Sequence, residues 1–334
     1  MRLIRAKKTA EGIAMLGKAI AMKPDWAQAY MAQQRVANIR AIFVEKDPTA
    51  FRALEYALQQ HRGAVTTTAL LGTFQDNIPA ILRQVGTSFA FFFIDPKGWT
   101  GFAMDNIRPI LRHRPGEVMV NFMYDFINRF INYPDSTNEQ SLDRFFGTTH
   151  WRDIRNTTDR EDASVDLYKE QLRATGAHTY VTSTGILKPL HNRAYFHLIY
   201  ATRNPKGILK FRDVEKQTVK EQDTVRAAAQ RTHRESTTGQ AELAFGPSAE
   251  ISTTIQLERR HRLNQAKGRL LHLIRQGPIP YEALQPLILE HPLVWNSDFN
   301  TLLLEAQQEG SLIIGGMTAR ERTPKRGHLI RSKP

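Results

Sequence analysis

The chain has 334 residues, of which 41% are hydrophobic and 24% are charged, as in an ordinary folded protein. It has no cysteine, which excludes disulfides, thiolate catalysis and cysteine-ligated zinc. No apolar run approaches the ~18 residues needed to span a membrane, and no apolar core follows the basic start Met1–Lys8, so we expect a cytoplasmic protein without a signal peptide. The net charge of +13 favours an anionic partner such as nucleic acid.

Residues 1–38 are predicted to be helical, because apolar side chains at Ile13, Leu16 and Ile20 recur at helical spacing. The run Ala19–Tyr30 resembles one unit of a tetratricopeptide repeat. A single unit cannot bury its own apolar face, since stable arrays need about three. We therefore expect residues 1–38 to form a helical segment that packs on the next domain.

From Ile39 onwards strands and helices alternate, a rhythm that predicts parallel βαβ units with right-handed crossovers. The expected strands are Arg40–Glu45, Ala64–Leu71, Phe89–Asp95 and Gly116–Asn121, and the expected helices are Pro48–Arg62, Gln75–Gln84 and Gly101–Leu111. After mostly helical residues 124–175, the β-rich runs His178–Leu187 and Tyr195–Thr202 predict an antiparallel hairpin that closes the sheet. Residues 39–235 are thus predicted to be a Rossmann-like α/β domain with a mostly parallel sheet.

The remainder of the chain has a different pattern. Residues 236–256 are rich in Ser, Thr and Gly and are expected to form a linker. Three helices, a short strand at Ser311–Ile314 and a Gly-Gly turn then predict a small winged-helix-like α+β module over residues 257–316. Residues 317–334 are expected to be a basic tail.

Basic residues are frequent in this C-terminal region. They are Arg259, Arg260, Arg262, Lys267, Arg269, Arg320, Arg322, Lys325, Arg326, Arg331 and Lys333. Such a cluster beside a winged-helix-like module suits contacts with nucleic-acid phosphates. It is also compatible with a solvated tail, or with a module that binds protein, so these alternatives stay open.

Polar residues follow two strands that we interpret as buried on both faces, Phe89–Ile94 and Glu117–Val120. Because ligands bind just past the carboxyl ends of such strands in open α/β sheets, we expect a site there. Asp95 follows the first strand and Asn121 the second, and either can orient a substrate nucleophile.

Other residues near these strand ends are candidates for the same site. Trp99 offers a face for stacking on a base or on a sulfonium, although it can equally be a core residue of a tight turn. If a helix starts near Phe122, then Asn121, Asp125 and Asn128 share one of its faces. The alternative for these three is a capped helix with a solvated stripe.

Glu45 ends the first strand of the predicted domain. In a Rossmann-like unit an acidic residue at such a position typically binds ribose hydroxyls. The simpler interpretation is that Asp47, before Pro48, caps the next helix. Both interpretations are compatible if Asp47 is the cap and Glu45 is the ligand.

The histidines are scattered without the spacing of metal ligands, so no metal site is predicted.

The segment from Ile42 to Val214 resembles the three-Cys-motif partner protein (TcmP) family. The matching runs are Phe43–Asp47, Phe92–Trp99, Val120–Phe130 and Tyr195–Gly207, and the C-terminal module is similar too. This family resembles class I S-adenosyl-L-methionine (SAM)-dependent methyltransferases in fold and is found beside genes for a radical-SAM-like protein with three cysteines. The resemblance implies SAM binding, with Glu45 at the ribose and Asp95 near the transferred methyl, and that three-Cys-motif protein as a partner.

The chain departs from the family pattern at two places. The glycine-rich loop that cradles the methionine part of the cofactor has no counterpart, since only Gly12 and Gly17 precede the matched region. Either the chain is an N-terminally truncated member, or residues 1–38 partly fill the gap. Thr73 stands where the family usually has the Asp that binds the adenine amine, with Asp76 close by as a substitute.

Two hypotheses follow. In the first, the chain is a SAM-dependent methyltransferase acting on nucleic acid or a partner protein, with Asp95, Asn121, Trp99 and Asp125 in the catalytic group. In the second, it is a non-catalytic module with a degenerate methyltransferase fold that binds nucleic acid or the cysteine-rich partner through its basic C-terminal region. The missing glycine-rich loop favours weak or absent catalysis.

Overall fold

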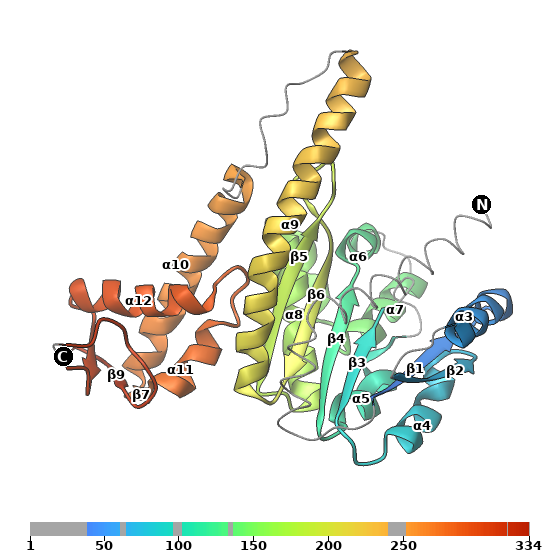
Figure 1. Ribbon diagram of the computed structural model, residues 1–334, viewed down its shortest axis with the longest axis horizontal. Coiled ribbons are helices and arrows are strands. Elements are labelled where there is room, and N and C mark those ends of the chain that lie inside the picture. The colour runs from blue at the N-terminus through green and yellow to red at the C-terminus, as the bar shows by residue number, and fades with distance from the viewer. Residues whose placement is uncertain are drawn as a thin grey trace. The chain divides into compact units, whose positions relative to one another are not determined.

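The computed structural model describes residues 39–60, 65–95, 102–132, 136–239, 252–318 and 320–333 (Figure 1). The predicted segment 1–38 and the predicted site residue Trp99 lie outside these ranges. The chain divides into two compact units between Gly86 and Thr87, and the described residues of each combine helices and strands. The predicted α/β class is confirmed, while the division falls inside the predicted domain 39–235. No helix in the described ranges is long and apolar enough to cross a membrane.

The first unit contains a two-stranded parallel sheet. Its described elements are β1 (Ile39–Glu45), α3 (Pro48–Gln60), β2 (Val65–Leu71) and α4 (Phe74–Val85). At the start of α3, Asp47 Oδ1 accepts hydrogen bonds from the backbone N–H groups of Thr49 and Ala50 at 2.9 and 2.8 Å. The predicted cap and the predicted βαβ connection are therefore both confirmed.

The second unit is built on a four-stranded sheet with the order β3-β4-β6-β5. Its strands are β3 (Ala90–Ile94), β4 (Gly116–Phe122), β5 (Tyr180–Leu187) and β6 (Ala194–Thr202). β3 and β4 are parallel, whereas β6 runs antiparallel to both β4 and β5. The predicted antiparallel hairpin is thus confirmed.

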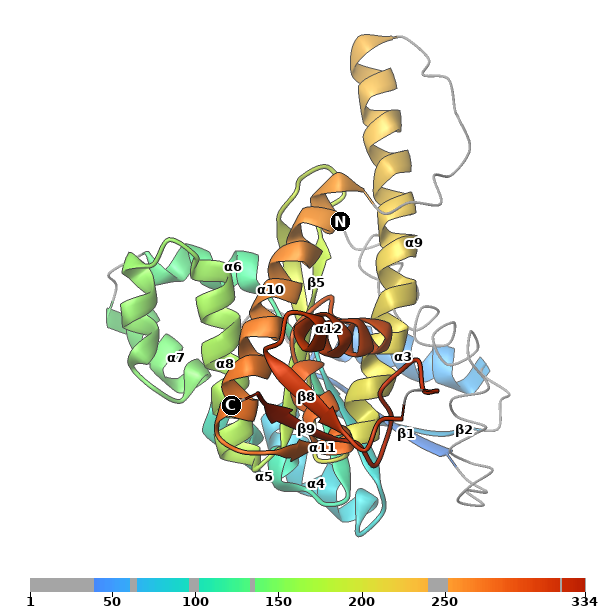
Figure 2. The same ribbon diagram turned by 90° about the vertical axis from the view of Figure 1, so that its left-hand side faces the viewer.

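Helices pack on both faces of this sheet (Figures 1 and 2). They are α5 (Met104–Arg112), α6 (Tyr124–Ile131), α7 (Ser136–Phe146), the 3-10 helix His150–Asn156, α8 (Arg160–Gly176) and α9 (Pro205–Thr238). On one face, Phe122 packs against Tyr168 of α8 with ring centroids 5.1 Å apart. On the other, Tyr200 stacks on Phe211 of α9 at 5.2 Å.

β3 is exposed on one face, so the prediction that Phe89–Ile94 is buried on both faces was wrong. Phe92 and Ile94 are buried, but Phe91 and Phe93 keep 45% and 46% of their surface exposed. Successive side chains of a strand point to opposite faces, and only the face of Phe92 is packed. The helix on the other face, α9, packs on β5 and β6, which lie at the opposite end of the strand order from β3, so it leaves Phe91 and Phe93 uncovered.

The described residues from 252 onwards form a module of helices and a three-stranded antiparallel sheet with the order β7-β9-β8. Its elements are α10 (Thr253–Arg275), β7 (Ile279–Pro280), α11 (Tyr281–Ile288), α12 (Asn296–Gln308), β8 (Leu312–Gly315) and β9 (Leu329–Ser332). β9 lies within the residues predicted to be a basic tail, and its Ile330 is fully buried. The ends of α9 and α10 likewise extend into the predicted linker 236–256.

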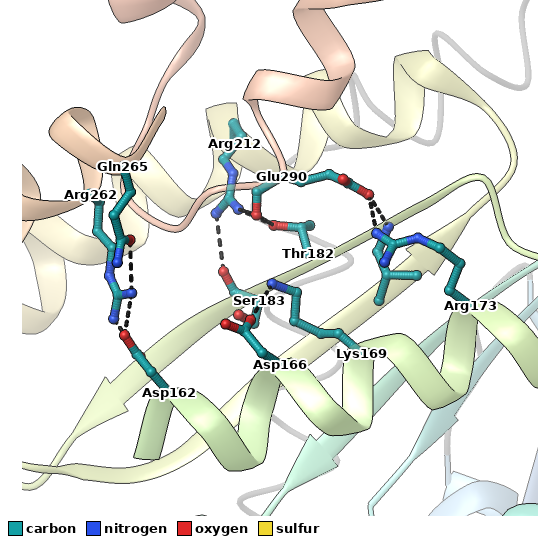
Figure 3. Close-up of polar contacts among 11 residues, drawn as sticks. Asp162, Asp166, Lys169, Arg173, Thr182, Ser183, Arg212, Arg262, Gln265 and Glu290 are labelled. Carbon is teal, nitrogen blue, oxygen red and sulfur yellow. Dashed lines mark hydrogen bonds and ion pairs between the residues drawn. The ribbon is translucent and has the colours of Figure 1, made fainter. Parts of the chain in front are cut away.

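A buried arginine joins this module to the sheet (Figure 3). Arg212 of α9 has no exposed surface, and its guanidinium pairs with Glu215 at 2.7 Å. It also donates hydrogen bonds to the carbonyl oxygens of Leu289 at 2.7 Å and Ser183 at 3.2 Å. Burying a charge is costly unless its protons find acceptors, and these acceptors come from the module, the sheet and α9.

Glu290 adds a second link at the same junction. Its Oε1 accepts hydrogen bonds from Arg173 of α8 at 2.6 Å and from the backbone N–H of Val181 at 2.7 Å. Near the beginning of α8, Asp162 accepts a hydrogen bond from Arg262 of α10 at 2.5 Å (Figure 3). The module therefore contacts the sheet domain through charged groups at several points.

We expect Arg212→Met to lower the free energy of unfolding by about 3–5 kcal/mol, because Glu215 would become an uncompensated buried charge. Urea denaturation followed by circular dichroism measures this loss. Arg260→Met, which removes an exposed cation of α10, is the matched control and should change stability by less than about 0.5 kcal/mol. Equal effects of the two substitutions would contradict the assigned role.

Stability should fall as the pH is lowered from about 6.5 to about 4. Burial, together with the nearby charge of Lys169, lowers the pKa of His291 at the junction to about 4. Burial, together with the nearby charge of Arg203, lowers the pKa of His178 to about 4 as well. The unfolded chain, whose histidines titrate near pH ~6.5, binds more protons in this window, so acid favours unfolding. We expect His291→Gln to reduce the drop in melting temperature between pH 7.5 and 5. An identical drop in the variant would contradict this.

Candidate functional site

The carboxyl ends of β3 and β4 bring together two predicted site residues. Because these strands are parallel neighbours, Asp95 and Asn121 lie at the same edge of the sheet. Asn121 Nδ2 donates a hydrogen bond to Asp95 Oδ1 at 2.6 Å. The amide oxygen of Asn121 is buried and has no hydrogen-bond partner among the described residues.

This geometry presents an oriented carboxylate at the surface. Asp95 is exposed, so a ligand can reach it, and one of its oxygens is held by the Asn121 amide. An ionised carboxylate only accepts hydrogen bonds. The pair is therefore suited to orient an amine or hydroxyl group of a ligand.

Asp125 does not share a helix face with Asn121, so the predicted row of Asn121, Asp125 and Asn128 was wrong. α6 begins at Tyr124, and Asn121 still belongs to β4. Helical i, i+4, i+7 spacing applies only within a helix. The break between strand and helix at Met123 therefore separates Asn121 from the other two.

Asp125 is instead surrounded by cations. Its carboxylate oxygens lie 2.8 Å from Lys188 Nζ, 3.4 Å from Arg129 Nη2 and 3.7 Å from Arg193 Nη1. The hydrogen bond from Lys188 holds the pKa of Asp125 below its ordinary range. A carboxylate so paired is a poor proton acceptor and acts as an anchor for the cations around it.

In the first unit, Glu45 and Thr73 lie at the ends of β1 and β2. Glu45 Oε1 accepts a hydrogen bond from the backbone N–H of Asp47 at 2.8 Å. Thr73 is the N-cap of α4: its hydroxyl accepts from the backbone N–H of Asp76 at 3.2 Å and donates to the Asp76 carboxylate at 2.6 Å. Thr73 and Asp76 thus form a helix cap, a role that needs no ligand.

Three residues near the start of α6 that were not among the predicted site residues lie together. His197 Nε2 lies 3.0 Å from Glu161 Oε1, and the rings of Tyr124 and His197 meet edge to face at 6.4 Å. Burial, with the Glu161 carboxylate nearby, raises the pKa of Tyr124 to about 12, so its hydroxyl stays protonated at neutral pH. These residues come from three separate elements, and no local spacing signals their contact.

The predicted basic C-terminal surface is partly used in ion pairs. Arg259 pairs with Asp298 at 2.5 Å and Lys267 with Glu309 at 2.6 Å, and Arg262 binds an α8 carboxylate as described above. The exposed members of this predicted surface are Arg260, Arg269, Arg320, Arg322, Lys325, Arg326, Arg331 and Lys333. Most of these eight cations lie on residues 316–328, between β8 and β9, or on β9 and the residue after it.

A surface depression of about 320 Å³ lies between α5 and α8. It is lined by Arg112, Arg114, Ala174, Thr175, Gly176 and Ala177. α5 ends at Arg112, shortly before β4 begins at Gly116. The depression is therefore at the amino end of β4 and is separate from Asp95 and Asn121 at the carboxyl end.

No family model matches the chain, and comparisons with curated proteins and with solved structures return no significant match. The resemblance to the TcmP family therefore rests on sequence motifs alone. The functional argument has to be made from the geometry of the described residues.

Proposed function

We propose that the chain is a TcmP-like, SAM-dependent methyltransferase that acts on nucleic acid or a partner protein. The observation that carries this proposal is the 2.6 Å hydrogen bond between Asn121 and Asp95 at the ends of two parallel strands. In open α/β sheets this edge is where ligands bind. The antiparallel hairpin β5–β6 beside β4 supports the Rossmann-like arrangement that the resemblance implies.

In this proposal Asp95 accepts a hydrogen bond from the nucleophilic amine or hydroxyl of the substrate, and Asn121 positions Asp95. The exposed carboxylate fits a ligand with such donors. SAM, when bound, would supply the electrophilic methyl group. Glu45 keeps its proposed ribose role from the resemblance alone.

The fit to the rest of the cofactor is weaker. Thr73 and Asp76 hydrogen-bond to each other in a helix cap, so neither is left in need of a cofactor group as a partner. This mismatch is the reason to keep a non-catalytic function as the second candidate. A three-Cys-motif, radical-SAM-like protein remains the proposed partner in either case.

The second candidate function is nucleic-acid binding by the C-terminal module. The order of its helices and its three-stranded sheet supports a winged-helix-like assignment, with residues 316–328 as the wing. α12 contains Asp298 and Glu305 but no Lys or Arg, whereas Arg322 and Arg326 of the wing are exposed. We therefore propose that the wing, and not α12, contacts phosphates.

Calorimetric titration with SAM tests the first function. We expect binding to the unmodified protein and at least about tenfold weaker binding to Glu45→Ala, which removes the proposed acceptor for the ribose hydroxyls, because a hydrogen bond to a charged group contributes about 1.5–3 kcal/mol. Asp105→Ala, which removes an 80% exposed carboxylate of α5, is the control and should bind normally. No heat from SAM or from its demethylated product with the unmodified protein would overturn the cofactor assignment.

Fluorescence anisotropy with duplex DNA over a range of KCl concentrations tests the second function. Each lost phosphate contact should reduce the slope of log K against log salt by about 1, so Arg322→Glu/Arg326→Glu should reduce it by about 2. The control Arg260→Glu/Arg269→Glu makes the same change in net charge on α10. Equal slopes for the two double variants would contradict a specific role of the wing.

A further inference from the structure

The loop between β5 and β6, residues 188–193, lies at the same sheet edge as Asp95 and Asn121. β6 is antiparallel to β4, so the beginning of β6 pairs with the end of β4, and His197 lies opposite Phe122. The loop that precedes β6 is therefore at the carboxyl end of β4. Contacts from Lys188 and Arg193 to Asp125 of α6 confirm this placement.

Buried and polar side chains of α9 hold the backbone of this loop. Arg226 is only 4% exposed, and its guanidinium donates to the carbonyl oxygen of Lys188 at 3.0 Å, to that of His191 at 3.1 Å and to Asn192 Oδ1 at 2.7 Å. Gln230 donates to a further loop carbonyl at 3.2 Å. These hydrogen bonds restrain the loop backbone, and a restrained loop loses less entropy when a ligand binds.

The loop and its neighbours on α6 and β6 present cations and an aromatic ring. Arg193 and Arg129 keep 62% and 68% of their side-chain surface exposed, and Tyr195 is 47% exposed. Lys188 Nζ lies 5.8 Å from the Tyr195 ring centroid. Among the described residues, Lys188, Arg193 and Arg129 share the single carboxylate of Asp125, so two of these three positive charges have no carboxylate partner in that part of the chain.

We propose that this surface, residues 188–193 with Arg129 and Tyr195, binds single-stranded nucleic acid. The unmatched cations fit phosphates, and an exposed tyrosine ring can stack on a base. Single strands offer free base faces, whereas the bases of a duplex are already stacked on each other. An acidic peptide would satisfy the cations but would leave the ring without a planar partner.

The inference rests on the proposed function in one respect, since it names the substrate class of that same sheet edge. Binding itself needs neither SAM nor catalysis. The two proposals therefore fail independently. Oligonucleotide binding without SAM binding would overturn the cofactor and leave this surface in place. If SAM binds but this surface contributes nothing to oligonucleotide binding, the proposed surface is overturned and the cofactor assignment is kept.

The test is anisotropy of a fluorescein-labelled oligouridine of about 12 nucleotides, a length within the usual range for single-strand binding sites. Full-length protein is titrated without SAM and with excess unlabelled duplex DNA, which occupies the proposed wing site. We expect Arg193→Glu/Tyr195→Ala to weaken binding at least tenfold. Arg108→Glu/Tyr56→Ala is the matched control, because Arg108 is 47% and Tyr56 67% exposed at other places on the chain.

The single variants separate direct contact from a structural effect. Arg193→Glu should reduce the salt slope, whereas Tyr195→Ala should weaken binding with the slope unchanged, because stacking releases no counterions. Equal dissociation constants for the test and control double variants would overturn the proposal. So would displacement of the oligonucleotide by polyglutamate as effectively as by unlabelled oligouridine, since this would assign the surface to acidic peptides.

Discussion

The buried guanidinium of Arg212 is the constraint on which the second unit depends. A charge without solvent needs acceptors for its protons, and those of Arg212 come from Ser183 in the sheet, Glu215 on α9 and Leu289 in the module. Moving the sheet or the module away from α9 would remove acceptors that the Arg212 guanidinium needs. The C-terminal module is therefore a fixed part of this unit, held at a defined position against β5 and α9 (Figure 3).

The same long helix connects this junction to the sheet edge where the site lies. α9 carries Arg212 near its beginning and Arg226 further along, and both arginines are buried and donate to backbone carbonyls. Arg226 fixes the loop at residues 188–193 as Arg212 fixes the module. A helix that is anchored at both places can hold the loop and the strand ends in constant register, as a binding site requires.

Two carboxylates at this edge have different roles because their surroundings differ. Asp95 is exposed and oriented by a neutral amide, so it is available to a ligand. Asp125 is paired with cations and anchors them. The sequence predicted that both belong to the carboxyl edge, from the polar residues that follow apolar strands. It could not predict their division of roles, since Lys188 is 63 residues from Asp125 along the chain.

The sequence alone determined four features: the alternation of strands and helices, the β5–β6 hairpin, the Asp47 cap and the strand ends at Asp95 and Asn121. Each of them depends on local periodicity or on neighbouring residues. Only the tertiary structure decided which surfaces are available. Residue alternation places Phe91 and Phe93 on one face of β3, but that face is open because α9 packs on β5 and β6 at the other end of the sheet. Likewise the sequence predicted that Arg262 belongs to a basic surface, whereas in the structure it binds Asp162, which is 100 residues away along the chain. Pairing between distant segments is set by packing of the whole unit, and no local pattern encodes it.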